Sequence, residues 1–438
     1  MTVAPPVGGV RKAGSRPSFL LPIAATLLSA FSPAATAHAA QPAEETEVAD
    51  TMAACREAIG ETTLVWRPAN LAAARAAVIA DDPDALFALR ALVAEADAAL
   101  GNGPYSVTDK TDPAPSGDRH DYVSIGPYWW PDPTRRDGKP YIRKDGQVNP
   151  ERDGPNFDRT RSGALADDVP TLALAAYFTG DERYAAHAER LLRTWFVDEA
   201  TRMNPDLRYA QAIPGRVDGR GIGIIDTHRY IDIVDAVLLL EAIGMLDEET
   251  VSGMRGWFDA YADWLVTSEN GQEERGEENN HGTWYDAQLM AFSLFSHDCA
   301  EAQRAFNHTL ARIAAQIDSD GSMPHEKDRT RSFHYHSFNL EAFLIVARLG
   351  EHLGADMYTY QSPEGSSLIG AISFMAKYAG REQEWPWQQI GEPAFDANWR
   401  NLRRASVIYS DEALARLTAK AAGRDPADRI LLLTWPEE

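Results

Sequence analysis

The sequence predicts an all-α protein built as an α/α toroid or solenoid of antiparallel helix pairs. Apolar residues recur at helical period through most of the chain, and Gly, Asp or Pro stands at the joins between the periodic segments. Strand-like alternation is nearly absent, apart from Ile430 to Thr434. Helix pairs that follow one another over about 400 residues are typical of toroids and solenoids. No repeat of fixed period is visible, which argues against a tetratricopeptide-like array.

The helical segments can be placed in order along the chain. Helices are expected at 71–100 with a break near 81–83, at 170–196 as a pair joined at 179–181, and at 228–244, 248–268, 282–297, 300–317, 333–352, 365–380 and 411–422. Two long segments, 101–168 and 201–227, depart from this pattern and are rich in Gly, Pro, Asp, Arg and aromatic residues. Loops of this length are usually functional or disordered, and their aromatic and Arg content favours ordered walls of a cleft.

The first forty residues have the composition of a secretory signal peptide. A basic leader, a short apolar run and a cleavage site of small residues follow one another at Arg11 to Arg16, Phe19 to Leu28 and Ala37 to Ala39. The apolar run is too short to span a bilayer. We therefore expect residues 1–40 to be removed on export, with the periplasm as the expected destination. The rest of the chain is then an acidic lead and a single toroidal domain, at 41–54 and 55–438.

The formal charge of the full chain is -23. Residues 1–40 contain three Lys/Arg and no Asp/Glu, so removing these three positive charges from -23 leaves -26. Such an acidic protein is a poor binder of nucleic acid and anionic membranes, and no segment after residue 40 is apolar for long enough to cross a membrane. A polyanionic substrate would require the basic residues to be gathered locally in a cleft. The pairing of Cys55 with Cys299 and the oligomeric state stay open.

Three segments concentrate polar and aromatic residues. The first, Gly126 to Pro133, places Tyr128, Trp129 and Trp130 in a loop framed by prolines. Adjacent large rings suit flat ligands such as sugars, whose C–H faces pack on aromatic rings. The alternative is a loop that packs on the toroid as a structural plug. We expect at least one of the three rings to bind a ligand.

The second segment, Glu278 to Asp286, begins one of the expected helices. Asn279, Asn280 and His281 place two amides and an imidazole at the helix N-terminus. The free N–H groups and the helix dipole there favour an anion such as a carboxylate. For this motif taken alone, an Asn N-cap beside a structural His is the commoner arrangement.

The third segment, His325 to Leu340, holds two arginines, several histidines and a tyrosine at the start of a strongly apolar helix. Arg329 or Arg331 beside a buried Tyr335 would stabilise the phenolate and lower a pKa that is ordinarily about 10. Such a tyrosine can act as a general base. The alternative is a first helical turn with solvated charges.

Taken together, these segments resemble the alginate lyase domain family. The resemblance covers roughly residues 115–350 and rests on HDYVSIGPYWWPDP at 120–133, YAQAIPGRVDGRGIGIID at 209–226, NNHGTWYD at 279–286 and RTRSFHYHSFNL at 329–340. It implies an incomplete α/α toroid that acts on an anionic polysaccharide. By this likeness the catalytic residues of the family fall on Asn280, His281, Tyr335 and Arg329, with Arg331 as a second candidate for the arginine. No metal-ligand array is evident, and we expect no metal or other cofactor.

The residue types suit β-elimination at a 4-linked uronate. Asn280, with His281 or Arg329, would neutralise the substrate carboxylate where negative charge builds up. Tyr335 would take the proton from C5 and return one to the leaving O4 oxygen. One residue can do both in β-D-mannuronate and β-D-glucuronate, because H5 and O4 lie on the same face of the ring. In α-L-guluronate they lie on opposite faces, and His281 is the candidate base.

Substrate positioning is expected from residues around this chemistry, namely Tyr128, Trp129, Gln211, Arg220, Asn279, Arg331 and His336. Arg220 lies in the segment Gly219 to Gly223, whose glycine spacing is wrong for a dinucleotide fingerprint. We expect a turn there that brings the backbone close to the cleft.

Three other functions stay open from the sequence. A glycoside hydrolase would need two carboxylates at the scissile bond, for which Asp286 and Glu326 can be nominated. A zinc enzyme is suggested by His334 and His336 together with His281 and His325, although helical positions two apart point the first two rings away from each other. A non-catalytic carbohydrate-binding or uptake protein would keep the aromatic residues but has no need for the polar cluster.

Overall fold

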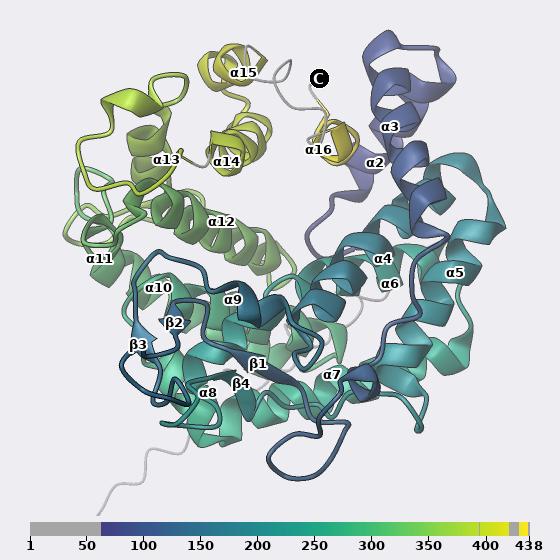
Figure 1. Cartoon of the computed structure of the whole chain (residues 1–438). Coiled ribbons are helices and arrows are strands. Elements are labelled where there is room, and N and C mark those ends of the chain that lie inside the picture. The colour runs from purple at the N-terminus through teal and green to yellow at the C-terminus, as the bar shows by residue number, and fades with distance from the viewer. Residues whose placement is uncertain (1–62, 394, 420–428, 437–438) are drawn as a thin grey trace, which may run out of the picture. The chain divides into compact units, whose positions relative to one another are not determined.

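The structure is a computed structural model that describes residues 63–393, 395–419 and 429–436. The expected signal peptide, the acidic lead and Cys55 lie outside these residues. Within the unit of residues 47–438, the described chain is an all-α toroid of successive helix pairs, with short strands in the connecting loops (Figure 1). The predicted fold class is confirmed. None of the described helices is long and apolar enough to cross a membrane.

The first helix pair packs against the last helix of the described chain. The elements are α2 (Pro68–Ile79), α3 (Pro83–Ala99) and α16 (Arg429–Thr434). α2 and α3 each begin with a proline, whose missing N–H is not needed in a first turn, and the Asp82 side chain caps α3. The strand-like alternation noted at Ile430 to Thr434 is therefore wrong as an indication of a strand. A short apolar run does not by itself distinguish a strand from a buried helical turn.

The second helix pair consists of α4 (Arg159–Thr179) and α5 (Glu182–Leu192). Gly180 joins them in a left-handed conformation, with a φ of 73°. α4 starts earlier than the sequence predicts, because Pro170 lies inside the helix instead of beginning it. A proline leaves the carbonyl four residues earlier without its usual N–H donor. That carbonyl belongs to Ala166 and accepts a hydrogen bond of 3.0 Å from the Arg229 guanidinium, which compensates for the interruption.

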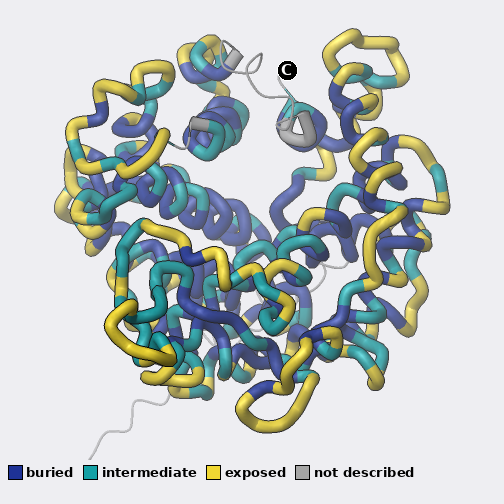
Figure 2. The backbone as a smooth tube through the Cα atoms, viewed as in Figure 1, coloured by how far each residue is buried: buried dark blue, intermediate teal, exposed yellow. Residues whose placement is uncertain are grey.

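The remaining helices are, in order, α6 (Tyr230–Ala242), α7 (Glu248–Thr267), α8 (Glu269–Arg275), α9 (Asn280–Phe295), α10 (Cys299–Gln316), α11 (Pro324–Lys327), α12 (Ser332–Glu351), α13 (Leu368–Ala376), α14 (Phe395–Tyr409) and α15 (Glu412–Ala419). α9 packs against α6, α7, α8, α10 and α12, and almost all of its residues are buried, as expected for a central helix. α12 is also buried along most of its length (Figure 2). The second and third polar motifs begin these two helices.

Two pairs of short strands tie the long loops together. β1 (Val123–Ile125) pairs in parallel with β4 (Tyr209–Ala212), and β2 (Trp129–Trp130) pairs antiparallel with β3 (Ile142–Arg143). The first pair joins the two long segments that the sequence assigns to a cleft. Short 3-10 or π turns complete the described chain at η1 (Val107–Asp109), η2 (Pro150–Asp153), η3 (Arg193–Val197), η4 (Gly221–Thr227) and η5 (Glu382–Glu384).

Candidate active site

A cavity of about 540 Å³ lies where the two long segments meet the first turns of α9 and α12. The first segment contributes Tyr128 and Trp129, and the second contributes Gln211 and Arg220. The helices contribute Asn279, Asn280, His281, His334, Tyr335 and Phe338, and Arg329 comes from the loop between α11 and α12. Both long segments are therefore ordered walls of one cavity, as the sequence predicts.

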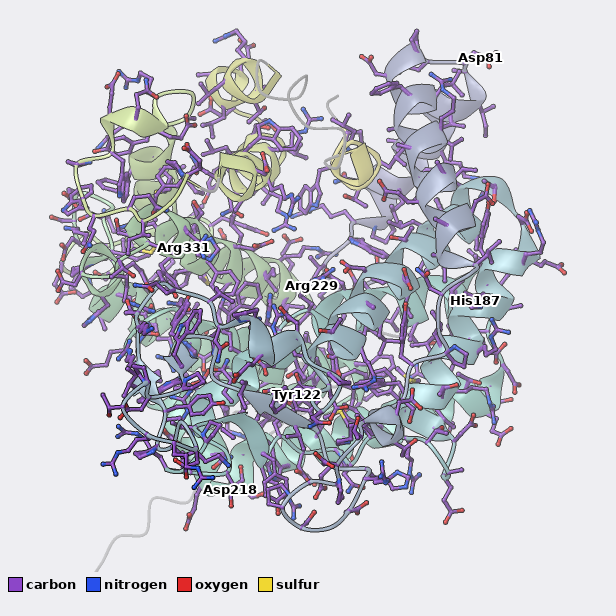
Figure 3. The ribbon with its side chains drawn as sticks, viewed as in Figure 1. Asp81, Tyr122, His187, Asp218, Arg229 and Arg331 are labelled. Carbon is purple, nitrogen blue, oxygen red and sulfur yellow. The ribbon has the colours of Figure 1, made fainter. Side chains whose placement is uncertain are left out.

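The cavity is basic although the chain is acidic. Its lining includes six arginines and two carboxylates, namely Arg143, Arg152, Arg159, Arg220, Arg229, Arg329, Asp226 and Glu277. The formal charge of the whole chain is -23. Basic side chains are thus gathered in the cavity, as binding of a polyanion by such an acidic protein would require. Arg229 (labelled in Figure 3) belongs to this set and also supports α4 through Ala166.

Asn279 and Asn280 have different roles at the start of α9. Asn279 is the N-cap, since its side chain accepts a hydrogen bond of 2.9 Å from the His281 N–H. Asn280 is buried, and its side-chain Nδ2 and backbone N–H both donate to the carboxylate of Glu326, at 3.0 and 2.6 Å. The Oδ1 atom of Asn280 is buried without a hydrogen-bond partner. The buried Glu326 carboxylate therefore fixes the orientation of the Asn280 amide.

His281 is held by a second buried carboxylate. Its Nδ1 lies 2.8 Å from Oε1 of Glu274, whose side chain is fully buried on α8. Burial alone would favour the neutral ring, but the negative charge and hydrogen bond of Glu274 outweigh it and raise the pKa of His281. The ring thus favours the imidazolium form and leaves Nε2 as the nitrogen that can reach a ligand.

Tyr335 lies between a tyrosine and an arginine. Its hydroxyl is 2.7 Å from that of Tyr128, and the guanidinium of Arg329 lies over its ring, 3.9 Å from the centroid. Burial raises the pKa of Tyr335 above its ordinary value, and the Tyr128 hydroxyl adds to this rise against the lowering effect of Arg329. The sequence-based expectation of a lowered pKa is therefore wrong for this state. A nearby cation is not sufficient when the phenol is also removed from water.

The structure brings Arg329, and not Arg331, to Tyr335. Arg329 lines the cavity, and its guanidinium lies 4.0 Å from Asp145, on the turn after β3. Arg331 is the N-cap residue of α12 and bridges through its backbone to Gln389. It is absent from the cavity lining, and Figure 3 shows it well apart from Arg229. The expectation that Arg331 contacts substrate is corrected on this ground.

His336 is a core residue and does not reach the cavity. Its ring is fully buried, accepts from the Met323 N–H at 3.2 Å, and lies 2.9 Å from the Ser332 carbonyl oxygen. It packs against the rings of Trp385 and Trp387. The expectation that it binds substrate is therefore corrected. His334 lines the cavity and stacks on Phe338, so these two histidines point apart, as helical geometry predicts.

Gln211 and Arg220 form one wall of the cavity. Gln211 has a φ of 46°, a region that non-glycine residues rarely adopt, so a strained backbone lies at the cavity. Its side-chain Nε2 donates to Asp226 at 2.9 Å, and its backbone carbonyl oxygen accepts from Arg220 at 2.8 Å. Trp129 lies against this wall, with the Arg220 guanidinium 6.0 Å from its ring centroid. Trp130 instead donates to the carbonyl of Gln147 and is absent from the lining.

The glycine-rich segment beside Arg220 is a closely packed turn. η4 begins at Gly221, and a Cβ atom at Gly223 would lie 2.6 Å from the Cβ of Ala210 on β4. A side chain at Gly221 would lie 2.5 Å from the Asn270 carbonyl oxygen. Close backbone packing therefore explains these glycines, and the predicted turn is confirmed.

Gly282 has a related role behind the Asn–His pair. A side chain there would overlap the Glu277 carbonyl and the Arg312 guanidinium. Arg312 donates to the carbonyls of Arg275 and Glu277 and to Asp286, at 2.5, 2.6 and 2.7 Å. This arginine therefore fixes the turn that carries the pair.

The carboxylates nominated for a hydrolase do not line the cavity. Asp286 is buried against Arg312, His308 and Thr309, and Glu326 is covered by Asn280. Among the residues that the structure describes, no group of three His, Cys, Asp or Glu side chains is placed to hold a metal ion.

Comparison with known proteins identifies the family. The family model described as alginate lyase matches residues 106–385. The chain belongs to the alginate lyase family. The resemblance noted in the sequence is thereby confirmed, and the enzyme is a polysaccharide lyase.

Solved structures agree with this assignment. The lyase shares 39% sequence identity with an alginate lyase from Bacteroides ovatus whose crystal structure is known. The two structures superimpose with a TM-score of 0.81, over 86% of this chain and 100% of that one. Alginate lyase A1-III from Sphingomonas species A1 is 17% identical, with a TM-score of 0.53 over 86% and 98% of the two chains, and shows the fold alone. A Tyr-to-Phe variant of A1-III complexed with tetrasaccharide is 15% identical, with a TM-score of 0.54 over 87% and 96%. A search of curated proteins finds no match.

Several residues that line or support the lyase cavity are absent from the sequence prediction. Glu274 lies on a short polar helix, and nothing in the sequence indicates that its carboxylate faces His281. Arg143 lies on β3, Arg152 in η2, Arg159 at the start of α4 and Arg229 at the N-cap of α6, and they belong to no local motif. The Arg content of the long loops was their one available signal.

Proposed function

We propose that the lyase cleaves alginate, or a related 4-linked polyuronate, by β-elimination with Tyr335 as the proton-transfer residue. The observation that carries the proposal is the position of Tyr335 against Arg329 in a basic cavity that also exposes Asn280 and His281. An alginate lyase of the same fold, A1-III, holds a tetrasaccharide in one of its structures, which supports an oligosaccharide in this cavity.

The first requirement is to neutralise the uronate carboxylate. Removal of the C5 proton moves negative charge onto this group, so hydrogen-bond donors and cations aimed at it lower the barrier. The imidazolium of His281 supplies a donor at one end of the cavity, and the Asn280 side chain lines the same cavity. Both are fixed by buried carboxylates before substrate arrives, so little reorganisation is needed.

The second requirement is a group that moves a proton on one face of the sugar. In the reactive form Tyr335 is a phenolate and Arg329, over its ring, stabilises the negative charge. The phenolate oxygen takes H5, the C4=C5 double bond forms, and the C4–O4 bond breaks. The proton then passes from Tyr335 to the leaving O4 oxygen, which regenerates the phenolate. This sequence suits mannuronate and glucuronate, in which H5 and O4 share a face.

The test is a product assay on purified protein. Polymannuronate, polyguluronate and glucuronan are incubated separately, with and without EDTA, and near-ultraviolet absorbance and new reducing ends are both recorded. We expect absorbance from the conjugated C4=C5 bond on polymannuronate or glucuronan, with or without EDTA. Reducing ends without absorbance would establish hydrolysis and overturn the proposal. Cleavage confined to polyguluronate would overturn the assignment of both proton transfers to Tyr335.

A further inference from the structure

Each of the two groups that would face the substrate carboxylate is held from behind by a buried glutamate. Glu326 accepts from two N–H groups of Asn280, which is neutral in any case. Glu274 contacts the Nδ1 atom of His281, which can carry a charge. The two glutamates therefore control different properties, the orientation of an amide and the protonation of an imidazole.

We propose that Glu274 is a positioning residue that keeps His281 protonated, with Nε2–H directed to the cavity, and so makes it a hydrogen-bond donor that cannot act as a base. The proposal rests on the β-elimination proposed above. It assigns Glu274 a part in substrate choice, because a protonated His281 cannot remove H5 from the face opposite Tyr335. Polymers in which H5 and O4 lie on opposite faces are then poor substrates.

Among the residues that the structure describes, His281 is the hydrogen-bond partner of the Glu274 carboxylate, and Arg220 interacts with its charge at longer range. The side chain is fully buried, Oε1 lies 2.8 Å from His281, and Oε2 is buried without a hydrogen-bond partner. A buried carboxylate without a counterion is strongly unfavourable, so a proton on the imidazole stabilises the pair. Burial raises the pKa of Glu274 as well, while the hydrogen bond and positive charge of His281 limit that rise.

Other charged groups around His281 act in both directions. Glu277, on the turn before α9, adds negative charge and raises the pKa of His281, whereas Arg329 lowers it. Glu326 lies on the far side of Asn280 and is itself influenced by both His281 and Arg329. Glu274 is the carboxylate that hydrogen-bonds to the ring, and its effect leads the others that raise the pKa.

The proposal has a distinct signature in the pH dependence of kcat/KM. The reactive form has a proton on His281 and none on Tyr335. Below the pKa of His281 this form increases about tenfold per pH unit, and above it the gain on Tyr335 is matched by the loss on His281, so the profile levels off. A lower pKa of His281 leaves the rising limb in place and makes the profile level off at a lower pH.

The experiment compares Glu274→Gln with wild type on the polymer that the enzyme cleaves. We expect the two profiles to superimpose at acid pH and to separate above the pKa of the variant's His281, with a plateau lower by about tenfold for each unit by which that pKa falls. A rate reduced by the same factor at every pH would mean a merely structural role and would overturn the proposal.

Two matched variants serve as controls. Glu278→Gln removes the same charge from an exposed position in the connection between α8 and α9, and we expect a wild-type profile. Glu326→Gln removes the carboxylate behind Asn280, and we expect a lower rate with the acid limb at its wild-type pH. A plateau lowered as much in Glu278→Gln as in Glu274→Gln, with the profile levelling off at the same lower pH, would show a general charge effect and overturn the proposal.

A second readout needs no turnover. The pKa of His281 is measured from its ring resonances by NMR in wild type, Glu274→Gln and the charge-conserving Glu274→Asp, with His281→Asn to assign the signal. We expect a value above 6.5 in wild type, a fall of at least about one unit in Glu274→Gln, and an intermediate value in Glu274→Asp. An unchanged pKa in a folded Glu274→Gln would overturn the proposal, whereas a lack of cleavage with the expected shift would overturn only the proposed function.

Discussion

The Arg329 guanidinium lies 3.9 Å from the centroid of the Tyr335 ring, on an aromatic face, while the Tyr335 hydroxyl is held by Tyr128 at 2.7 Å. The cation favours the phenolate, and the neutral phenol partner together with burial favours the protonated form. Three substitutions around this ring separate the two influences.

Tyr335→Phe tests the proton transfer itself. We expect kcat to fall by at least about 10²–10⁴-fold, the range that general acid–base catalysis contributes, because both the base and the acid are lost. KM or the Kd for an oligosaccharide should change little, since the ring and its contact with Arg329 remain. Steady-state kinetics and calorimetric binding measure the two quantities. A kcat near the wild-type value would remove Tyr335 from the mechanism.

Tyr128→Phe tests the hydrogen bond that raises the Tyr335 pKa. Without the Tyr128 hydroxyl, less opposes the effect of Arg329, so the pKa of Tyr335 should fall from its raised value. The rising limb of the kcat/KM profile and its alkaline fall should then both move to lower pH, while the pH at which the profile levels off, which reports His281, stays in place. A profile with both limbs unmoved would show that this hydroxyl has no influence on the reacting phenol.

Arg329→Ala and Arg331→Ala form a matched pair in the same loop. We expect Arg329→Ala to lower kcat by about 10²-fold or more, because phenolate stabilisation and a cavity cation are both lost. Arg331→Ala should stay within a few-fold of wild type, since Arg331 is outside the cavity lining. The reverse order would mean that the loop rearranges on substrate binding, and the assignment of Arg329 would be wrong.

A large part of the fold follows from local pattern. The breaks at Asp82–Pro83 and Gly180 are visible as turn and capping residues, and the apolar period places α6, α7, α9, α10 and α12 within about two or three residues. α14 is absent from the sequence prediction. The start of α4 is missed because Pro170 suggests a beginning, and its actual support comes from Arg229, far along the chain.

The candidate site, like the fold, could be predicted from the sequence only in part. Asn280, His281 and Tyr335 lie in compact motifs at helix starts, so the sequence can nominate them. The pKa of Tyr335, the burial of His336 and the Glu274 contact depend on tertiary packing that no local pattern records. From sequence spacing alone, either Arg329 or Arg331 could be the arginine that acts with Tyr335. The contact of Arg329 with the Tyr335 ring identifies Arg329.

Asp235 on α6 provides a stability test remote from the cavity. Its fully buried carboxylate accepts from the backbone N–H groups of Leu64, Val65 and Trp66, at 2.5 to 3.0 Å. We expect Asp235→Asn to lower the free energy of unfolding by about 1–3 kcal/mol, because buried N–H groups lose acceptors. Urea denaturation measures the change, and a difference within error would show that these hydrogen bonds are replaced by others.

The same carboxyl group gives a pH dependence of stability. Burial raises the pKa of Asp235 from 3.8 to about 7, so the folded protein binds more protons than the unfolded chain between these values. Its contribution is therefore fully present below about pH 4 and is lost as the pH rises to about 7. The stability difference between wild type and Asp235→Asn should shrink across this window. A constant difference would contradict the raised pKa.

The arginine-lined cavity within an acidic molecule has a kinetic consequence. We expect a polymer with one negative charge per sugar to be repelled by the acidic exterior, so that productive encounters occur at the mouth of the cavity. Added salt should lower the rate of these encounters, because it screens electrostatic attraction over about 10 Å at 0.1 M ionic strength. Each cut also leaves a shorter fragment with fewer carboxylates for the arginines to hold. We therefore expect shorter fragments to be held less tightly, so that the enzyme releases its products in favour of intact polymer.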